Sequence, residues 1–220
     1  LHGRVIPLAA GAALANPRLR VIAEGGDGGT LSEGIGHLVH AVRSNYKMLF
    51  ILHNNENYGL TTGQASSTTR KGRRMNSTPD GVFIEPMNAC DFVLGLGGTF
   101  VARTFSGDVK HMADMLRQGL SHDGFAFLEV LQTCPSYNRE TPQEWYWERL
   151  KYLEGNRGRS REEARRLAAD MEKEINVGVL YRDPDSVSYL NHLKSREGRK
   201  TTLVEEVGPF DISRLINSLR

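Results

Sequence analysis

The chain has 220 residues, with 28 lysines and arginines against 26 aspartates and glutamates. This near balance gives no support for binding to nucleic acid or to a membrane through net charge. The length suits one large α/β domain. No apolar run approaches the roughly 20 residues of a membrane span, so no transmembrane or secretory segment is expected and a cytoplasmic location is the default.

The first predicted elements form a strand–helix–strand unit. Apolar runs at residues 19–23 and 48–52 are typical of buried strands, and residues 32–44 between them have the pattern of a helix. The strands of such a unit lie parallel, so the loops that follow them emerge at one edge of the sheet, where open α/β sheets bind ligands. We therefore expect residues 25–29 and 53–59 to face a common site.

The remaining elements extend this unit into a doubly wound, mostly parallel α/β sheet. Residues 66–83, rich in Ser, Thr, Gly and basic side chains, are typical of a long connection. A charged stretch at residues 158–174 favours an exposed helix. Between them the pattern predicts a helix at 88–95, a strand at 100–103, a helix at 109–120 and a strand at 125–131.

The two loops carry oxygen atoms that suit a magnesium ion. Residues 25–29 supply the carboxylate of Asp27 and the amino end of a helix, whose partial positive charge favours phosphate. Asn55 and Asn57 supply amide and carbonyl oxygens, and two phosphate oxygens and a water would complete the six ligands that magnesium takes. The pair of loops predicts a magnesium–diphosphate clamp, although Gly-Asp-Gly-Gly is also an ordinary turn and asparagine also ends strands.

Gly-Asp-Gly followed at this distance by Asn-Asn is similar to the thiamine diphosphate motif, and further segments resemble the beta subunit of 2-oxoacid:ferredoxin oxidoreductases. Those segments are His-Gly-Arg-Val-Ile-Pro at 2–7, Tyr-Gly-Leu-Thr-Thr-Gly-Gln at 58–64, Thr-Pro-Asp-Gly at 78–81, Thr-Phe-Val-Ala-Arg at 99–103 and Gly-Val-Leu-Tyr-Arg at 178–182. We accordingly expect a thiamine diphosphate-binding domain at residues 1–140 and a helical carboxyl-terminal extension, residues 141–220, packed on it.

The resemblance assigns roles to individual residues. Asp27 matches the magnesium-binding carboxylate, Asn55 the side-chain ligand, and Asn57 the residue whose backbone carbonyl completes the protein's ligands. The expected cofactor-binding residues are His2, Gly26, Asp27, Gly28, Gly29, Asn55, Asn57, Tyr58, Gly59, Leu60 and Thr61.

The resemblance also implies an activity and partners. In that family, thiamine diphosphate decarboxylates a 2-oxoacid of the pyruvate or 2-oxoglutarate class in the presence of coenzyme A, and electrons pass to iron–sulfur centres and ferredoxin. An alpha-type subunit supplies the pyrimidine half of the site and the acid needed to activate the cofactor. A hetero-oligomer is therefore expected, in which this chain is half of an active site.

The chain contains only two cysteines, Cys90 and Cys134, which cannot supply the four thiolates of a [4Fe-4S] cluster. Cys134 resembles the family position of the last cluster ligand, and the other three would come from a Cys-x-x-Cys segment and another cysteine that precede the first residue here. The chain is therefore expected to lack its amino-terminal part, and Cys134 is either a cluster ligand when those cysteines are supplied or a small buried side chain. Cys90 is expected to pack in the core.

Several polar residues near the loops have more than one interpretation. The four basic residues Arg70, Lys71, Arg73 and Arg74 could contact coenzyme A phosphates, a substrate carboxylate or an acidic ferredoxin, or could be solvated. Glu56 is expected to be solvated or to lie at a subunit interface.

Two other functions remain open at the level of sequence. One is a non-catalytic subunit that keeps the clamp and binds diphosphate without turnover. The other is a non-oxidative thiamine diphosphate enzyme split into two chains, such as a decarboxylase or an acetohydroxyacid synthase, against which the Tyr-Gly-Leu-Thr and Gly-Val-Leu-Tyr-Arg segments argue. A nucleotide loop is disfavoured, because neither a Gly-Lys-Ser/Thr ending nor a Gly-x-Gly-x-x-Gly spacing is present.

Overall fold

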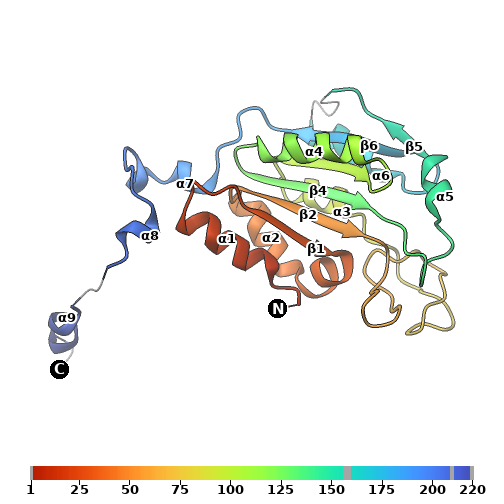
Figure 1. Cartoon of the computed structure of the whole chain (residues 1–220), viewed down its shortest axis with the longest axis horizontal. Coiled ribbons are helices and arrows are strands. Elements are labelled where there is room, and N and C mark those ends of the chain that lie inside the picture. Colours follow the sequence, from red (N-terminus) through yellow and green to blue (C-terminus); the bar gives the residue numbers. More distant parts are fainter. Residues whose placement is uncertain (1, 156–159, 209–210, 219–220) are drawn as a thin grey trace.

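The computed structural model describes residues 2–155, 160–208 and 211–218. Helices alternate with strands over most of the chain, and short helices follow the last strand (Figure 1). The elements in chain order are α1 (Val5–Ala15), β1 (Ile22–Gly26), the π-helix η1 (Gly28–Glu33), α2 (Ile35–Ser44), β2 (Met48–Asn54), α3 (Ala89–Gly95), β3 (Phe100–Phe105), α4 (Val109–Leu120), β4 (Phe125–Leu131), α5 (Gln143–Trp147), β5 (Leu150–Tyr152), α6 (Arg161–Ala169), β6 (Ile175–Arg182), α7 (Tyr189–His192), the 3₁₀-helix η2 (Lys194–Arg196), α8 (Leu203–Glu206) and α9 (Ser213–Ser218).

The strands of the described residues form one sheet in the order β1-β2-β4-β3-β6-β5. The pairs β1/β2, β2/β4 and β3/β4 are parallel, whereas β6 runs antiparallel to β3 and carries β5 parallel to itself at the edge. In Figure 1 the arrows of β2 and β4 point toward the loops that follow β2. The predicted α/β class with a mostly parallel sheet is confirmed.

Helices cover both faces of the sheet, which explains the continuous apolar run in β2. Successive side chains of a strand point to opposite faces. Phe50 and Leu52 therefore pack in the cluster that includes Leu38 of α2, while Leu49 and Ile51 pack on the other face with Met115 of α4. A strand buried on both faces needs apolar residues at every position, as is usual in parallel sheets.

The sequence patterns locate several elements closely. The helix Val109–Leu120 and the strand Phe125–Leu131 begin and end where they are predicted. β1 begins later than expected, at Ile22. It continues into residues 25–29, the glycine loop, because Gly25 and Gly26 pair with Leu52 and His53 of β2. Inter-strand pairing therefore decides where this strand ends.

The helix predicted at residues 32–44 consists of two segments, η1 and α2, joined at Gly34. A Cβ atom at Gly34 would lie 2.4 Å from the carbonyl oxygen of Gly3, so the amino-terminal segment packs directly on this junction and only glycine fits. The first of the two segments, η1, begins at Gly28, so helical backbone starts within the glycine loop itself. π-helical turns are rare and occur frequently at functional sites.

The carboxyl-terminal part contains strands as well as helices. The predicted exposed helix within residues 158–174 is α6, of which Ala164 and Ala168 are buried, and residues 158 and 159 lie outside the described residues. The sequence patterns do not predict α1, β5 or β6. Within the described ranges, no helix has the length and apolar character needed to cross a membrane.

His122 makes the stability of this fold sensitive to acid. Its side chain is buried, and Nε2 lies 2.8 Å from the hydroxyl of Thr99, which in turn donates to Asn45. Burial, assisted by the positive charge of Arg182, lowers the pKa of His122 to about 4. The unfolded chain binds the proton at a higher pH than the folded protein does. The contribution of neutral His122 to the free energy of unfolding is therefore complete above the unfolded pKa of about 6.5 and is lost as the pH falls toward the folded pKa.

We therefore expect wild type to lose about 2 to 3 kcal/mol more stability than a His122→Gln variant between pH near 7.5 and pH near 4.5. Urea unfolding of both proteins at the two pH values measures this difference. Other groups titrate in both proteins, so only the difference between the two losses is assigned to His122, and equal losses would contradict the assignment.

Candidate functional site

The loops that follow β1 and β2 lie side by side at the carboxyl edge of the sheet. Gly26, the last residue of β1, is the pairing partner of His53, so Asp27 and Asn54 each directly follow a paired residue, and Asn54 is the last residue of β2. The hydroxyl oxygen of Thr68 lies between them, 2.7 Å from Oδ2 of Asp27 and 2.9 Å from Oδ1 of Asn54. The structure therefore brings three segments into contact: the glycine loop, residues 53–59 (the asparagine loop) and the long connection at residues 66–83.

Asp27 is a buried carboxylate, with 1% of its surface exposed. The hydroxyls of Ser66 and Thr68 both donate to Oδ2, at 2.5 and 2.7 Å. Burial raises the pKa of Asp27 to about 6, and the negative charge of Glu56 acts in the same direction, against the two hydroxyl bonds. In the described part of the chain no basic side chain pairs with Asp27. A divalent cation at this carboxylate would supply the missing positive charge.

Asn55 and Asn57 form a tight turn at the end of β2. Oδ1 of Asn55 accepts from the backbone amide of Asn57 at 3.2 Å, and Nδ2 of Asn57 donates to the carbonyl of Asn55 at 2.8 Å. Glu56 between them has a φ of 61°, in the left-handed region. These side-chain bonds to backbone hold the chain in a conformation that non-glycine residues rarely adopt.

Tyr58 closes the glycine loop from outside. Its hydroxyl lies 3.1 Å from the carbonyl oxygen of Gly28 and 3.2 Å from Oε1 of Glu33. The ring of His2 stacks on that of Tyr58 with centroids 6.1 Å apart, and Nε2 of His2 lies 3.4 Å from the same Glu33 oxygen. His2, Gly28 and Tyr58, all predicted as site residues, are thus in mutual proximity. A Cβ at Gly29 would lie 3.1 Å from Nε2 of His2, whereas one at Gly26 would meet only a carbonyl oxygen at 4.0 Å.

The last three expected cofactor-binding residues, at positions 59–61, lie at the tip of a closed loop. Tyr58 and Gln64 form an isolated bridge, and the amide of Gly63 donates to the carbonyl of Tyr58 at 2.8 Å. Gly59, Leu60 and Thr61 form the tip, and Leu60 is 94% exposed. The tip is therefore exposed to solvent, and Tyr58 at its base contacts the glycine loop.

Gly28 cannot be replaced without moving Tyr58. An added Cβ would lie 2.5 Å from the tyrosine ring, well inside van der Waals contact. We expect Gly28→Ala to lower the free energy of unfolding by about 1 to 3 kcal/mol, because the ring must leave the loop and its bond to the Gly28 carbonyl is lost. Urea unfolding measures this change.

Gly36→Ala is the matched control for Gly28→Ala. Gly36 lies in α2, and a Cβ there meets no atom within 4 Å. Alanine is the better helix former, so this variant is expected to be as stable as wild type or more stable by up to about 1 kcal/mol. Equal effects of the two substitutions would contradict the close packing of Tyr58 on Gly28.

Behind the loops lies a fully buried ion pair that sequence reasoning missed. Nε of Arg103 in β3 lies 2.7 Å from Oε2 of Glu129, its pairing partner in β4, and their side chains are 0% and 1% exposed. Oε1 of Glu129 accepts from Nδ2 of Asn54 at 2.8 Å. Burial by itself raises the pKa of Glu129, but the charge and hydrogen bonds of its partners outweigh it, and the pKa is lowered. Each of the two strands contains one charged residue among uncharged ones, and the two charges are opposite, which is the sequence signal from which this pair could have been predicted.

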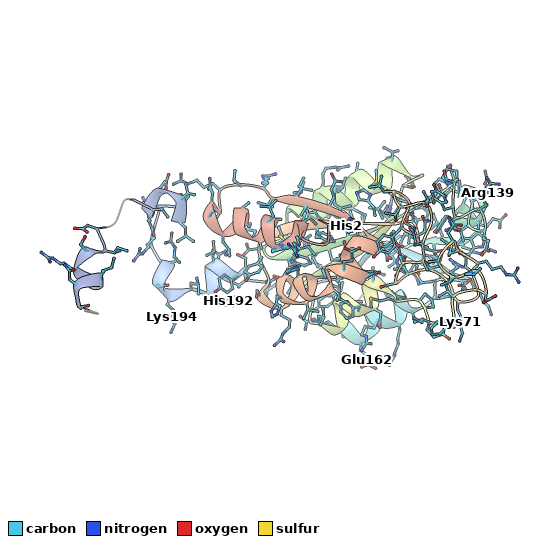
Figure 2. All side chains as sticks on the ribbon, turned by 90° about the horizontal axis from the view of Figure 1, so that it is seen from below. His2, Lys71, Arg139, Glu162, His192 and Lys194 are labelled. Carbon is cyan, nitrogen blue, oxygen red and sulfur yellow. The ribbon has the colours of Figure 1, made fainter. Side chains whose placement is uncertain are left out.

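Glu56 is also an internal residue, and the expectation that it is solvated is wrong. It is 4% exposed, and its carboxylate lies 2.6 Å from Nη1 of Arg73 and 3.2 Å from Nε of Arg70. Of the four basic loop residues, these two are therefore internal counter-ions. Lys71 pairs with Glu85 at the surface, and Arg74 is exposed. Figure 2 shows Lys71 at the same end of the molecule as Arg139, away from the end that carries His192 and Lys194.

Both cysteines are buried and free. Cys90 is 0% exposed and belongs to the main core cluster, as expected, and its thiol lies 3.1 Å from Oε2 of Glu129. Cys134 lies at the edge of the candidate site, with Sγ 3.7 Å from Oδ1 of Asn57. Among the described residues, no group of three or more His, Cys, Asp or Glu side chains could hold a metal. A cation at Asp27 would accordingly depend on amide and carbonyl oxygens.

Comparison with known proteins identifies two family models along the chain. Residues 1–130 match the model described as thiamine pyrophosphate enzyme, C-terminal TPP binding domain. Residues 134–197 match the model for the C-terminal part of the pyruvate ferredoxin oxidoreductase beta subunit.

Curated relatives and a solved structure agree with these matches. The 2-oxoacid:ferredoxin oxidoreductase subunit beta of a Sulfolobus species is 35% identical over 93% of this chain and 76% of its own length. The beta subunit of 2-oxoacid:ferredoxin oxidoreductase 1 from Aeropyrum pernix is 38% identical over 89% of this chain and 65% of its own length. The structure of the 2-oxoglutarate:ferredoxin oxidoreductase from Magnetococcus marinus, with 2-oxoglutarate, coenzyme A and succinyl-CoA bound, superposes with a TM-score of 0.85 and 33% identity over all of this chain and 74% of that chain. The chain therefore belongs to the beta-subunit family of the 2-oxoacid:ferredoxin oxidoreductases, a family of multi-subunit oxidoreductases.

Proposed function

We propose that this chain binds magnesium thiamine diphosphate and is the cofactor-carrying subunit of an enzyme that oxidatively decarboxylates a 2-oxoacid. One observation carries the proposal. Asp27 is a buried carboxylate with a raised pKa and, among the described residues, no ion-pair partner, and Thr68 links it to Asn54, which directly precedes the turn of two asparagines. That donor set, all oxygen with a single negative charge, fits a magnesium ion whose remaining ligands include phosphate oxygens.

The proposed ligands are the carboxylate of Asp27, the side-chain oxygen of Asn55 and the backbone carbonyl of Asn57. The diphosphate would lie against the backbone of Gly28 and Gly29 and the tip formed by Gly59, Leu60 and Thr61. Tyr58 holds the glycine loop through the Gly28 carbonyl, and His2 covers Tyr58 from outside. Thiamine diphosphate, when bound, supplies the chemistry that removes carbon dioxide from a 2-oxoacid and releases electrons.

The proposed partners follow from the name of the family. We propose that the pyrimidine half of the site, and the acid that activates the cofactor, come from an alpha-type subunit, and that electrons pass through iron–sulfur centres to ferredoxin. Cys134 is the proposed ligand that this chain gives to a [4Fe-4S] cluster, with the other three thiolates supplied from elsewhere. Its position next to Asn57 supports this role, because a cluster there would lie close to the cofactor.

The substrate is proposed to be a 2-oxoacid of the pyruvate or 2-oxoglutarate class. The relatives include proteins named as 2-oxoglutarate oxidoreductase and 2-oxoglutarate synthase subunits, which favours 2-oxoglutarate as the first compound to test. Reduction of viologen dye by the chain combined with its genomic neighbour, under anaerobic conditions with coenzyme A and a panel of 2-oxoacids, identifies the substrate. Equal rates with every 2-oxoacid and with none added would contradict the proposed activity.

The first test needs only this chain. We expect magnesium plus thiamine diphosphate, at one hundred times the dissociation constant, to add about 2.7 kcal/mol of stability, measurable as a rise in melting temperature. Magnesium alone should give a much smaller rise, because the diphosphate oxygens are missing. No rise with both ligands would contradict cofactor binding, and measurable 2-oxoacid oxidation by the single chain would contradict the proposal that it is half an active site.

A further inference from the structure

The hydroxyl of Thr68 occupies an unusual position between the two loops of the candidate site. It lies 2.7 Å from Oδ2 of Asp27 and 2.9 Å from Oδ1 of Asn54, and Thr68 is buried, with 4% of its surface exposed. Ser66 contacts the same carboxylate oxygen at 2.5 Å and also lies 3.1 Å from the Thr68 hydroxyl. Two neutral hydroxyls thus converge on one oxygen of Asp27.

This convergence fixes the orientation of the carboxylate. With both hydroxyls on Oδ2, the carboxyl group cannot rotate about its Cβ–Cγ bond without breaking two hydrogen bonds to a charged group, which are among the stronger hydrogen bonds in proteins. A metal ligand whose rotation is restricted loses less entropy when the ion binds. This is the usual effect of hydrogen bonds from a residue behind the ligand, which tune metal affinity without touching the metal.

Thr68 also lies against residues at the centre of the sheet. Asn54, whose Oδ1 faces Thr68, donates from Nδ2 to Glu129, and Glu129 is paired with Arg103 across β3 and β4. Arg103 also donates to the carbonyl of Ala168 at the end of α6. A continuous series of buried contacts therefore runs from the Asp27 carboxylate through Thr68 and Asn54 to a rigid ion pair.

We propose that Thr68 is a positioning residue for the metal-binding carboxylate: its hydroxyl, which donates its one proton to Oδ2 of Asp27, holds Asp27 in the orientation that binds the divalent cation of the cofactor. Ser66 acts on the same oxygen. This inference rests on the proposed function, because it assigns Thr68 a role only if Asp27 binds a metal. The rival explanation is that Thr68 merely packs the connection against the loops.

Three variants separate the two explanations. Thr68→Val keeps the shape and removes the hydroxyl, and Thr68→Ser keeps the hydroxyl and removes the methyl group. Ser67→Ala is the matched control, because the adjacent Ser67 hydroxyl bonds Ser32 at 2.8 Å rather than Asp27. Calorimetric titration of magnesium into the full chain, at saturating thiamine diphosphate, measures the metal affinity of each protein. Melting temperatures without ligands measure any loss of packing.

We expect Thr68→Val to weaken magnesium binding about 10- to 100-fold, the usual range for loss of a hydrogen bond behind a metal ligand. Thr68→Ser should stay close to wild type, and Ser67→Ala should bind as wild type does. The electron paramagnetic resonance spectrum of Mn²⁺ in place of magnesium should broaden or change in Thr68→Val, because the geometry of its ligands is less uniform.

Each outcome decides the matter. If wild type itself binds no magnesium with thiamine diphosphate, the proposed function fails. If wild type binds and Thr68→Val binds equally well, the positioning role fails while the proposed function stands. If Thr68→Ser, which keeps the hydroxyl, weakens binding as much as Thr68→Val does, the hydroxyl alone does not preserve affinity and the positioning role fails.

Discussion

Asp27→Asn is expected to weaken the binding of magnesium thiamine diphosphate by more than about 100-fold, corresponding to at least about 2.7 kcal/mol. The substitution keeps the shape of the side chain but removes the only negative charge that the proposed protein ligands offer to the ion. Calorimetry with wild type and variant measures the loss. Binding of the variant within about tenfold of wild type would contradict the assignment of Asp27 as a metal ligand.

The same substitution should stabilise the protein in the absence of ligands. Burial raises the pKa of Asp27 to about 6 in the folded protein, above its unfolded value. An acid whose pKa is raised on folding destabilises the folded protein at pH values where the acid is ionised. The free energy of unfolding is therefore reduced at pH 7 and is recovered as the pH falls through about 6 and Asp27 takes up a proton. A neutral asparagine avoids that penalty, and ligand-free Asp27→Asn is expected to gain up to about 3 kcal/mol near pH 7.

Urea unfolding at pH near 7.5 and near 5 tests this expectation, since the advantage of the variant should shrink at the lower pH. Asp80→Asn is the control, because Asp80 lies in the exposed part of the long connection. A destabilised ligand-free Asp27→Asn protein would show that the carboxylate is required by the fold rather than by a ligand. The expected combination, a more stable protein that no longer binds, is characteristic of a functional charge.

Arg103→Met is expected to lower the free energy of unfolding by about 3 to 5 kcal/mol. The substitution leaves Glu129 fully buried and without its cationic partner, although its bond from Asn54 remains. A buried unpaired charge is one of the most destabilising changes that a single substitution can make. Urea unfolding near neutral pH measures it.

The double variant Arg103→Met/Glu129→Gln should recover much of the loss, because neither position then carries a buried charge and glutamine can still accept from Asn54. Arg166→Met is the surface control: Arg166 pairs with Glu162 one helical turn away, but both side chains are more than three-quarters exposed, at 77% and 78%. Removing such a pair changes stability by less than about 0.5 kcal/mol. If Arg103→Met behaves like Arg166→Met, the buried pair does not hold the sheet as described.

Local sequence patterns predict the elements that are decided by local chemistry. α4 and β4 match their predicted bounds because periodic apolar residues and a capping aspartate, Asp108, define them without help from distant residues. The adjacency of the glycine and asparagine loops also follows from a general rule, since parallel neighbours place their carboxyl ends at one edge. The position of Asp27 beside Asn54 could therefore be predicted before any coordinates.

What the sequence did not predict depends on contacts between distant segments. Arg103 and Glu129 each lie in an apolar strand, and nothing in either strand alone indicates that the two pair across the sheet. Glu56 looked like a surface residue because its arginine partners follow it by fourteen and seventeen residues within an irregular connection. Strand β6 was missed for the same reason, because its place beside β3 is decided by antiparallel pairing.

The reversed direction of β6 also determines where the last part of the chain goes. Because β6 is antiparallel to its neighbour β3, it begins at the edge of the sheet that carries Asp27 and ends at the opposite edge. The helices α7, α8 and α9, which follow β6, therefore lie at the far end of the molecule (Figure 1). In Figure 2, His192 and Lys194 accordingly lie at the opposite end from Lys71. A fluorescent label or an affinity handle on residues 189–206 would thus be remote from the cofactor loops and could report on assembly while leaving coenzyme binding undisturbed.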